Sequence, residues 1–166
     1  VKIAMAFEQD AFSQDVRLGV IEAAKRTKSK IIIDDKLPRE LNDMAATLAK
    51  VKAVKPDLLI VSGHTKGALT AVRQISEMNI DVPMLAMTHC DAYKLSKYVG
   101  KNAEHTLCVS QWHKDLSYSD NIFTNGIRYD EDFTITFGYP PPYQAAESSA
   151  ALLVYKDAFE RANSFD

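Results

Sequence analysis

Polar and aromatic side chains that could bind a ligand or do chemistry follow short apolar segments of this 166-residue chain. His64 and Thr65 follow the apolar run in "DLLIVSGHTKG", Thr88 and His89 follow "VPMLAM", and Phe12 comes shortly after "KIAMAF". An imidazole can act as a base, a metal ligand or a hydrogen-bond donor, and a hydroxyl can donate and accept. Such a mixture also suits a small polar ligand with an apolar part.

A catalytic or metal-binding role for these residues would need a third side chain beside them, and none is evident in the sequence. His89 beside Cys90 could form a base and a nucleophile, but neighbouring residues at a strand end diverge in direction, and no orienting group is evident. His64 and His89 could bind zinc together, yet no third ligand stands at a recognisable spacing. Asp34 and Asp35 are more typical of a solvated turn than of an acid–base pair. We therefore expect no catalytic residue, no metal site and no cofactor.

The signatures of common enzymes are also missing where they would be diagnostic. The segment "FEQDAFSQD" has no glycine, so it lacks the GxGxxG and GxxxxGK[ST] loops that bind nucleotide phosphates. The GxSxG motif of hydrolases is absent. A receiver domain would need an aspartate near Ser62 and a lysine near Gln111. These absences argue against an enzyme.

Short apolar segments alternate with amphipathic ones over the first 110 residues. We predict strands at residues 2–7, 30–34, 57–61, 82–87 and 105–110. We predict helices at residues 11–27, from Leu41 to just before Pro56, through Leu69, Val72 and Ile75, and at 91–100. The pattern indicates an α/β fold, a doubly wound parallel sheet with helices on both faces in a Rossmann-like three-layer arrangement. Ligands bind outside the carboxyl ends of such strands, where the candidate residues stand.

Some of these residues also have a purely structural interpretation. Ser62 and Gly63 could form only the tight turn between a strand and a helix, with Thr65 as the N-cap. We interpret Trp112 as packing at a domain junction rather than stacking on a ligand. After residue 110 we expect no clear strand, then a proline-stiffened turn at "GYPPPY" and a long alanine-rich helix from Tyr143. This tail is predicted to pack on something outside the first 110 residues.

Composition limits the choice of partners. The net charge is −2 and no block of like charge occurs, so we expect no nucleic acid partner. No apolar run approaches the roughly 20 residues that span a bilayer, so we expect no membrane insertion. For Cys90 and Cys108 a disulfide remains open, but two buried thiols are the expectation. The chain opens on Val1, which indicates a piece of a longer protein.

Taken together, the segments resemble the second lobe and return segment of the type I periplasmic substrate-binding proteins of ABC transporters, in the branch of the branched-chain amino acid receptors. The resemblance rests on "KIAMAFEQDAFSQDVRLGVIEAAKR", on "LNDMAATLAKVKAVKPDLLIVSGHTKGALTAVRQISEMNIDVPML" and on "YPPPYQAAESSAALLVYKDAFERANSFD". It implies that residues 1–112 form the second ligand-binding lobe, and that residues 113–166 form a hinge crossing and helices that pack on a first lobe. The ligand would be trapped between the two lobes on closure.

The resemblance also implies ligand contacts. Phe12 matches an aromatic residue that lies against the ligand in the family's amino acid receptors, and His64, next to Thr65, stands where a tyrosine contacts it. The family's acidic residue that meets the ligand's ammonium group falls at Thr88 or His89, where no acid stands. Imidazole donors in these places favour an aromatic or aliphatic carboxylate or an amide over an ordinary α-amino acid.

The partners implied are the small-molecule ligand and the membrane permease of an ABC transporter, with a periplasmic or extracellular location. The alternative is a ligand-sensing domain of a receptor or regulator, because some of these use a similar two-lobed fold. We expect the isolated piece not to bind ligand measurably, and its tail to pack on its own sheet or to swap with a neighbouring copy in a domain-swapped or dimeric form.

Overall fold

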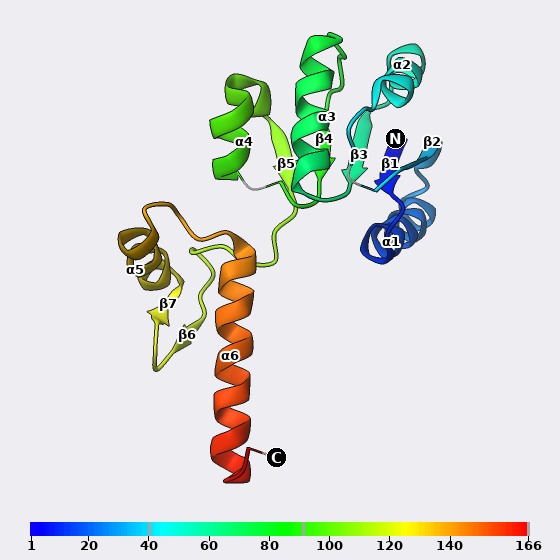
Figure 1. Cartoon of the computed structure of the whole chain (residues 1–166). Coiled ribbons are helices and arrows are strands. Elements are labelled where there is room, and N and C mark those ends of the chain that lie inside the picture. The colour runs from blue at the N-terminus through cyan, green and yellow to red at the C-terminus, as the bar shows by residue number, and fades with distance from the viewer. Residues whose placement is uncertain (40, 91, 166) are drawn as a thin grey trace. The chain divides into compact units, whose positions relative to one another are not determined.

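A computed structural model describes residues 1–39, 41–90 and 92–165 of the chain (Figure 1). The chain divides into two compact units, Val1–Val109 and Ser110–Asp166. Within the described ranges, no helix is both long and apolar enough to cross a membrane.

The first unit is a parallel sheet with helical crossovers. Its strands have the order β2-β1-β3-β4-β5, and every neighbouring pair is parallel. The elements are β1 (Lys2–Glu8), α1 (Ala11–Thr27), β2 (Lys30–Leu37), α2 (Ala45–Val54), β3 (Leu58–Ser62), α3 (Thr65–Glu77), β4 (Leu85–Met87), α4 (Ala92–Val99), a 3₁₀ turn (Gly100–Ala103) and β5 (Thr106–Cys108). This confirms the doubly wound parallel sheet.

The strand order determines which face each helix covers. The chain steps one way from β1 to β2 and then the other way through β3, β4 and β5, so right-handed crossovers place α1 opposite α2, α3 and α4 (Figure 1). The main core lies on the side of α2–α4, and Ala4 and Ala6 of β1 belong to it together with Leu48. Phe7 faces the other side, and the Arg17 guanidinium of α1 lies 5.1 Å from its ring centre.

The acidic pair of β2 corrects one expectation. Asp34 and Asp35 lie inside β2, which runs three residues beyond the predicted end, and not in a turn after it. Successive side chains of a strand point to opposite faces. Asp34 accordingly accepts a hydrogen bond from Arg17 Nε at 2.9 Å, while Asp35 accepts one from Thr47 Oγ1 at 2.8 Å and pairs with Lys50. Each carboxylate therefore ties the edge strand to the helix on its own side.

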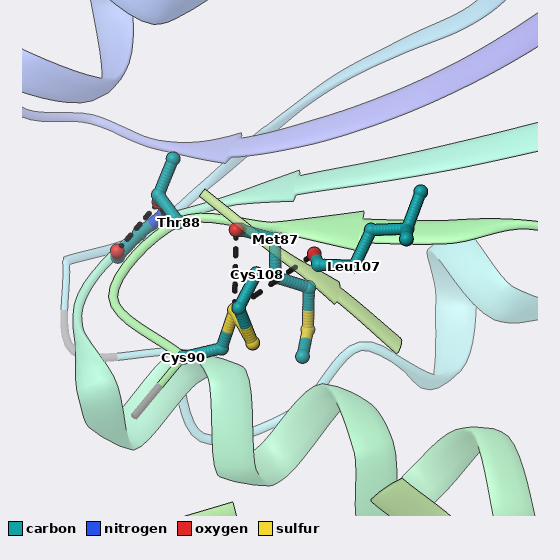
Figure 2. The surroundings of a disulfide bond; sticks show 6 residues. Met87, Thr88, Cys90, Leu107 and Cys108 are labelled. Atoms are coloured by element: carbon teal, nitrogen blue, oxygen red, sulfur yellow. Dashed lines mark hydrogen bonds between the residues drawn. A yellow bond between two sulfur atoms is a disulfide. The ribbon is translucent and has the colours of Figure 1, made fainter. Parts of the chain in front are cut away.

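The two cysteines correct a second expectation. Cys90 and Cys108 form a disulfide with a Cα–Cα distance of 5.4 Å, so the expectation of two buried thiols is wrong (Figure 2). The reason is the strand register. Met87 of β4 lies opposite Cys108 of β5, and the chain brings Cys90 back over that pair within three residues.

The second unit holds more regular structure than the sequence indicates. It contains a short antiparallel pair, β6 (Ser119–Asp120) and β7 (Thr124–Asn125), followed by α5 (Gly126–Phe137) and α6 (Tyr143–Ala162). The expectation of no strand after residue 110 is therefore wrong. Strands of two residues show no periodicity, and α5 begins where the Asn125 side chain accepts a hydrogen bond from Arg128 N at 2.9 Å. The proline-rich turn and the long final helix are confirmed.

Leu48→Ala tests the main core. Leu48 is fully buried, so the substitution should lower the free energy of unfolding by about 2–5 kcal/mol through lost burial and a residual cavity. Urea denaturation followed by circular dichroism measures this. The matched control is Leu18→Ala on α1, where the side chain is 58% exposed and the change should stay within about 0.5 kcal/mol. Equal effects of the two substitutions would contradict the assigned core.

Candidate functional site

Three of the predicted site residues meet at the carboxyl edge of the sheet. Phe12 is the second residue of α1, which follows β1, while His64 follows β3 and His89 follows β4. The ring centres of Phe12 and His89 are 4.9 Å apart in an edge-on arrangement, and those of His64 and His89 are 5.1 Å apart. Neighbouring strands β1, β3 and β4 thus bring together residues that are far apart in sequence. We call these residues, with Glu8 and Asp10, the carboxyl-edge cluster.

Thr88 is buried, and its hydroxyl is engaged by the backbone. Its Oγ1 accepts a hydrogen bond from Gly63 N at 3.1 Å and donates one to Gly63 O at 3.0 Å, at the end of β4 that Figure 2 shows. Thr88 therefore holds the turn between β3 and α3. Thr65, half-buried, is the first residue of α3 and not its N-cap. His64 occupies the cap position, and within the described part of the chain its side chain forms no capping bond. This corrects the predicted cap.

Glu8 is a charged residue buried at the centre of the cluster. Glu8 is only 1% exposed, and its Oε1 accepts a hydrogen bond from His64 N at 3.3 Å. A Cβ atom on Gly63 would lie 2.4 Å from Glu8 Oε1, and one on Gly67 would lie 2.5 Å from the same atom. Glycine is therefore needed at both positions to leave room for the carboxylate. A glutamate at the end of an apolar strand is the sequence signal of this feature.

Asp10 lies beside Glu8 and serves as the N-cap of α1. Its Oδ1 accepts a hydrogen bond from Ser13 N at 2.9 Å. Its Oδ2 is buried, has no hydrogen-bond partner within residues 1–39, 41–90 and 92–165, and lies 3.8 Å from His64 Nε2. Burial raises the pKa of Asp10, but hydrogen bonds from Ser13 and the nearby charges of His64 and Arg39 outweigh burial and hold that pKa below its ordinary value. Asp10 is therefore a carboxylate at neutral pH.

His89 adopts a left-handed backbone conformation with φ of 50°. Burial lowers the pKa of His89, the nearby His64 lowers it further, and an interaction with the Gly63 backbone and the charges of Asp10 and Glu8 only partly oppose these effects. His89 is therefore neutral at pH 7. A neutral imidazole both donates and accepts a hydrogen bond.

The exposed part of the cluster consists of rings. The His64 side chain is 56% exposed and Phe12 is 37% exposed, whereas Glu8 and Asp10 lie beneath them. The Asp10 end of the cluster borders a hollow of about 370 Å³, which is lined by Gln9, Asp10, Ala11, Gln14, Lys36 and Arg39. This arrangement offers stacking surfaces and hydrogen-bond donors to a small molecule, with cationic side chains at one side.

A separate cavity lies within the second unit. It measures about 300 Å³ and is lined mostly by apolar side chains of residues 112–153, among them Trp112 and Tyr129. The Trp112 ring lies 5.6 Å from that of Tyr129, and the Tyr129 hydroxyl shares a hydrogen bond of 3.0 Å with Ser149 Oγ. Two of its polar groups, the Tyr129 and Ser149 hydroxyls, thus pair with each other. We regard this cavity as a gap among packed aromatic side chains.

Known proteins resemble this chain in sequence pattern and in fold. A family model described as periplasmic binding protein matches residues 2–166. The fold is similar to that of a leucine binding protein from Thermotoga maritima MSB8, with a TM-score of 0.80 and 20% identity over 99% of this chain and 46% of that one. It is also similar to a solute binding protein of an ABC transporter from R. palustris in complex with benzoate, with a TM-score of 0.75 and 16% identity over 87% and 38% of the two chains.

A third similar structure is a branched-chain amino acid transporter substrate binding protein from Streptococcus pneumoniae in complex with isoleucine. The TM-score is 0.74 and the identity 16%, over 95% of this chain and 44% of that one. At these identities the likeness establishes the fold alone. The chain spans less than half the length of each of these structures.

Gly63→Ala tests the fit of Glu8. The added Cβ would lie 2.4 Å from Oε1 and 2.9 Å from Cγ of Glu8, a residue that is 1% exposed, so the free energy of unfolding should fall by about 1–3 kcal/mol. Gly19→Ala is the matched control. Nothing lies within 4 Å of a Cβ there, in the middle of α1, so that substitution should stabilise the chain by about 0.5–1 kcal/mol.

A double substitution tests whether the cost of Gly63→Ala comes from the contact with Glu8 or from the loss of the glycine itself. In Glu8→Ala the clashing atoms are gone, so adding Gly63→Ala to it should cost much less than Gly63→Ala alone. Thermal and urea unfolding of the unchanged chain, the two single variants and the double variant give this coupling. Strictly additive costs would contradict the close fit between Glu8 and Gly63.

Proposed function

Since this chain belongs to the periplasmic binding protein family, we propose that it supplies one lobe of a two-lobed solute receptor. The carboxyl-edge cluster is the solute-facing surface of that lobe. Phe12, His64 and His89 contact the solute directly, and Thr65 and Thr88 hold the loop that presents His64. The receptor works in the periplasm or outside the cell and delivers its solute to the membrane permease of an ABC transporter.

The observation that carries this proposal is the meeting of Phe12, His64 and His89 at one edge of the sheet. The rings follow three different strands, and those of Phe12 and His64 lie 4.9 Å and 5.1 Å from the ring of His89. The carboxyl edge of an open parallel sheet is where ligands bind. Exposed aromatic and imidazole rings are costly to leave in water. Covering them with a ligand or a closing lobe therefore lowers the free energy.

The chemistry of the cluster favours a solute that carries a carboxylate or an amide. His64 and His89 can each donate a hydrogen bond, and Lys36 and Arg39 border the adjoining hollow. The acidic groups are beneath the rings, because Glu8 is buried and Asp10 Oδ2 is buried. A solute with an aromatic or branched aliphatic body would stack on Phe12. Benzoate, isoleucine and leucine, bound by or named for the similar proteins, are the first compounds to try.

The exposed apolar residues of α6 support a contact with a first lobe outside these 166 residues. Leu152, Val154 and Tyr155 are 70%, 68% and 62% exposed. A helix with such side chains in water is typical of a contact surface. We propose that residues 1–112 form the second lobe of the receptor, and that residues 113–166 cross the hinge and pack on the first lobe.

His64→Ala in the two-lobed receptor tests the proposal. Losing a donor and a stacking ring that face the solute should weaken binding at least about tenfold, which corresponds to roughly 1.4 kcal/mol. Isothermal titration calorimetry with the best compound of an amino acid, amide and aromatic carboxylate panel measures the affinity. Phe12→Ala should have a similar effect.

The matched control is His113→Ala, because His113 is exposed and lies in the second unit, outside the cluster. Its affinity should stay within about twofold of the unchanged receptor. If His64→Ala and Phe12→Ala leave the affinity unchanged in a folded receptor, the cluster is not the solute-facing surface.

A further inference from the structure

We propose that Glu8, Asp10 and His64 together bind a divalent transition-metal ion, with Zn²⁺ as the expected ion. This site goes beyond solute binding and does not depend on it. The sequence offers His64 and His89 without a third ligand, whereas the fold brings two carboxylates to His64 from the other side, at the end of β1.

The distances suit ligands that share one ion. One ligand atom from each of Glu8, Asp10 and His64 lies within 4.8 Å of the others. Two ligand atoms bound tetrahedrally to one Zn²⁺ at about 2.0–2.2 Å are roughly 3.3–3.6 Å apart. Asp10 Oδ2 and His64 Nε2, at 3.8 Å, are slightly farther apart than this. The His64 side chain is 56% exposed, so its ring has room to move closer to Asp10.

A buried oxygen without a hydrogen bond is the second observation that points to a ligand. The Asp10 side chain is 10% exposed, and its Oδ2 is buried and has no hydrogen-bond partner among the residues that the structure describes. At 3.8 Å it is too far from His64 Nε2 for a hydrogen bond. A buried carboxylate oxygen left in this way costs free energy, which an ion between Asp10 and His64 would remove.

The charge of the cluster favours a cation at the same place. Glu8 and Asp10 bring two acidic groups beneath the rings of His64 and His89. A divalent cation would compensate two carboxylates held this close in a buried position. His89 lies against His64, and its contact restricts how that ring can turn.

The donor set indicates which ion is preferred. One imidazole nitrogen and two carboxylate oxygens suit zinc, which binds nitrogen and oxygen ligands tetrahedrally. Mg²⁺ and Ca²⁺ prefer a full shell of oxygen ligands and would gain little from His64. The two cysteines do not compete, because they are joined in a disulfide. Three protein ligands leave one tetrahedral position for water, and the exposed side of His64 provides the path of entry.

Titration of the chain with ZnCl₂ tests the site, with no thiol reductant and no chelating buffer. Calorimetry should show one saturable Zn²⁺ per chain, and Mg²⁺ and Ca²⁺ at equal concentrations should give no comparable heat. In ¹H–¹⁵N spectra of the histidine rings, the His64 resonances should move on Zn²⁺ addition while those of His113 stay in place.

Two substitutions remove ligands while keeping the local structure. Asp10→Asn retains the oxygen that caps α1 and loses the negative charge, and His64→Gln removes the imidazole. Each should weaken Zn²⁺ binding at least tenfold, since losing even an outer partner of a metal ligand costs roughly 10- to 100-fold. Circular dichroism confirms that both variants fold, so a loss of binding is not a loss of structure.

The matched controls are Asp43→Asn and His113→Gln. Asp43 also accepts a backbone hydrogen bond near a helix start, from Ala45 N at 2.9 Å, and His113 lies 3.3 Å from the Asp115 carboxylate on an exposed surface. Both controls should bind Zn²⁺ as the unchanged chain does. Lack of saturable binding below about 100 µM Zn²⁺ would overturn the proposal, because ordered water would then suffice between Asp10 and His64. Binding that survives Asp10→Asn and His64→Gln, or that is lost in His113→Gln, would overturn it as well.

Discussion

The carboxylate of Glu8 is buried where β1 ends against the first turn of α3. It limits the conformations that the residues packed around it can adopt. A charged group in that position must be hydrogen-bonded and tightly enclosed. His64 N donates to it, and Gly63 and Gly67 leave the space it occupies. The turn from β3 into α3 therefore has little freedom, and Thr88 fixes it from the β4 side through Gly63. His64 is consequently presented at the surface from a rigid base.

The same constraint links the two roles proposed for the cluster. The rings of Phe12, His64 and His89 are outward and suit a solute, while Glu8 and Asp10 are inward and suit a cation. His64 belongs to both sets, with an exposed ring face and with Nε2 directed at Asp10. A side chain on a rigid turn can serve both purposes because its position does not depend on the ligand.

The sequence predicts the order of strands and helices well, because buried parallel strands and amphipathic helices each have their own periodicity. It also places Phe12, His64 and His89 at strand ends, and the parallel sheet brings them together.

The features that the sequence does not predict depend on strand register and on contacts between residues far apart in the chain. The sequence places Asp34 in a turn, whereas in the structure it accepts a hydrogen bond from Arg17. It predicts a free thiol at Cys90, whereas the register of β5 places Cys108 opposite Met87 and within reach of a disulfide. Asp10 becomes a candidate ligand only when β3 brings His64 to it.

The most direct test of the central claim is hydrogen–deuterium exchange of the two-lobed receptor with and without its solute. The account predicts slower amide exchange on solute binding in residues 8–13, 62–66 and 88–90, which carry the carboxyl-edge cluster. Residues 119–153, around the cavity of the second unit, should gain no comparable protection from direct contact. Protection confined to that cavity, with the cluster unchanged while solute is bound, would contradict the account.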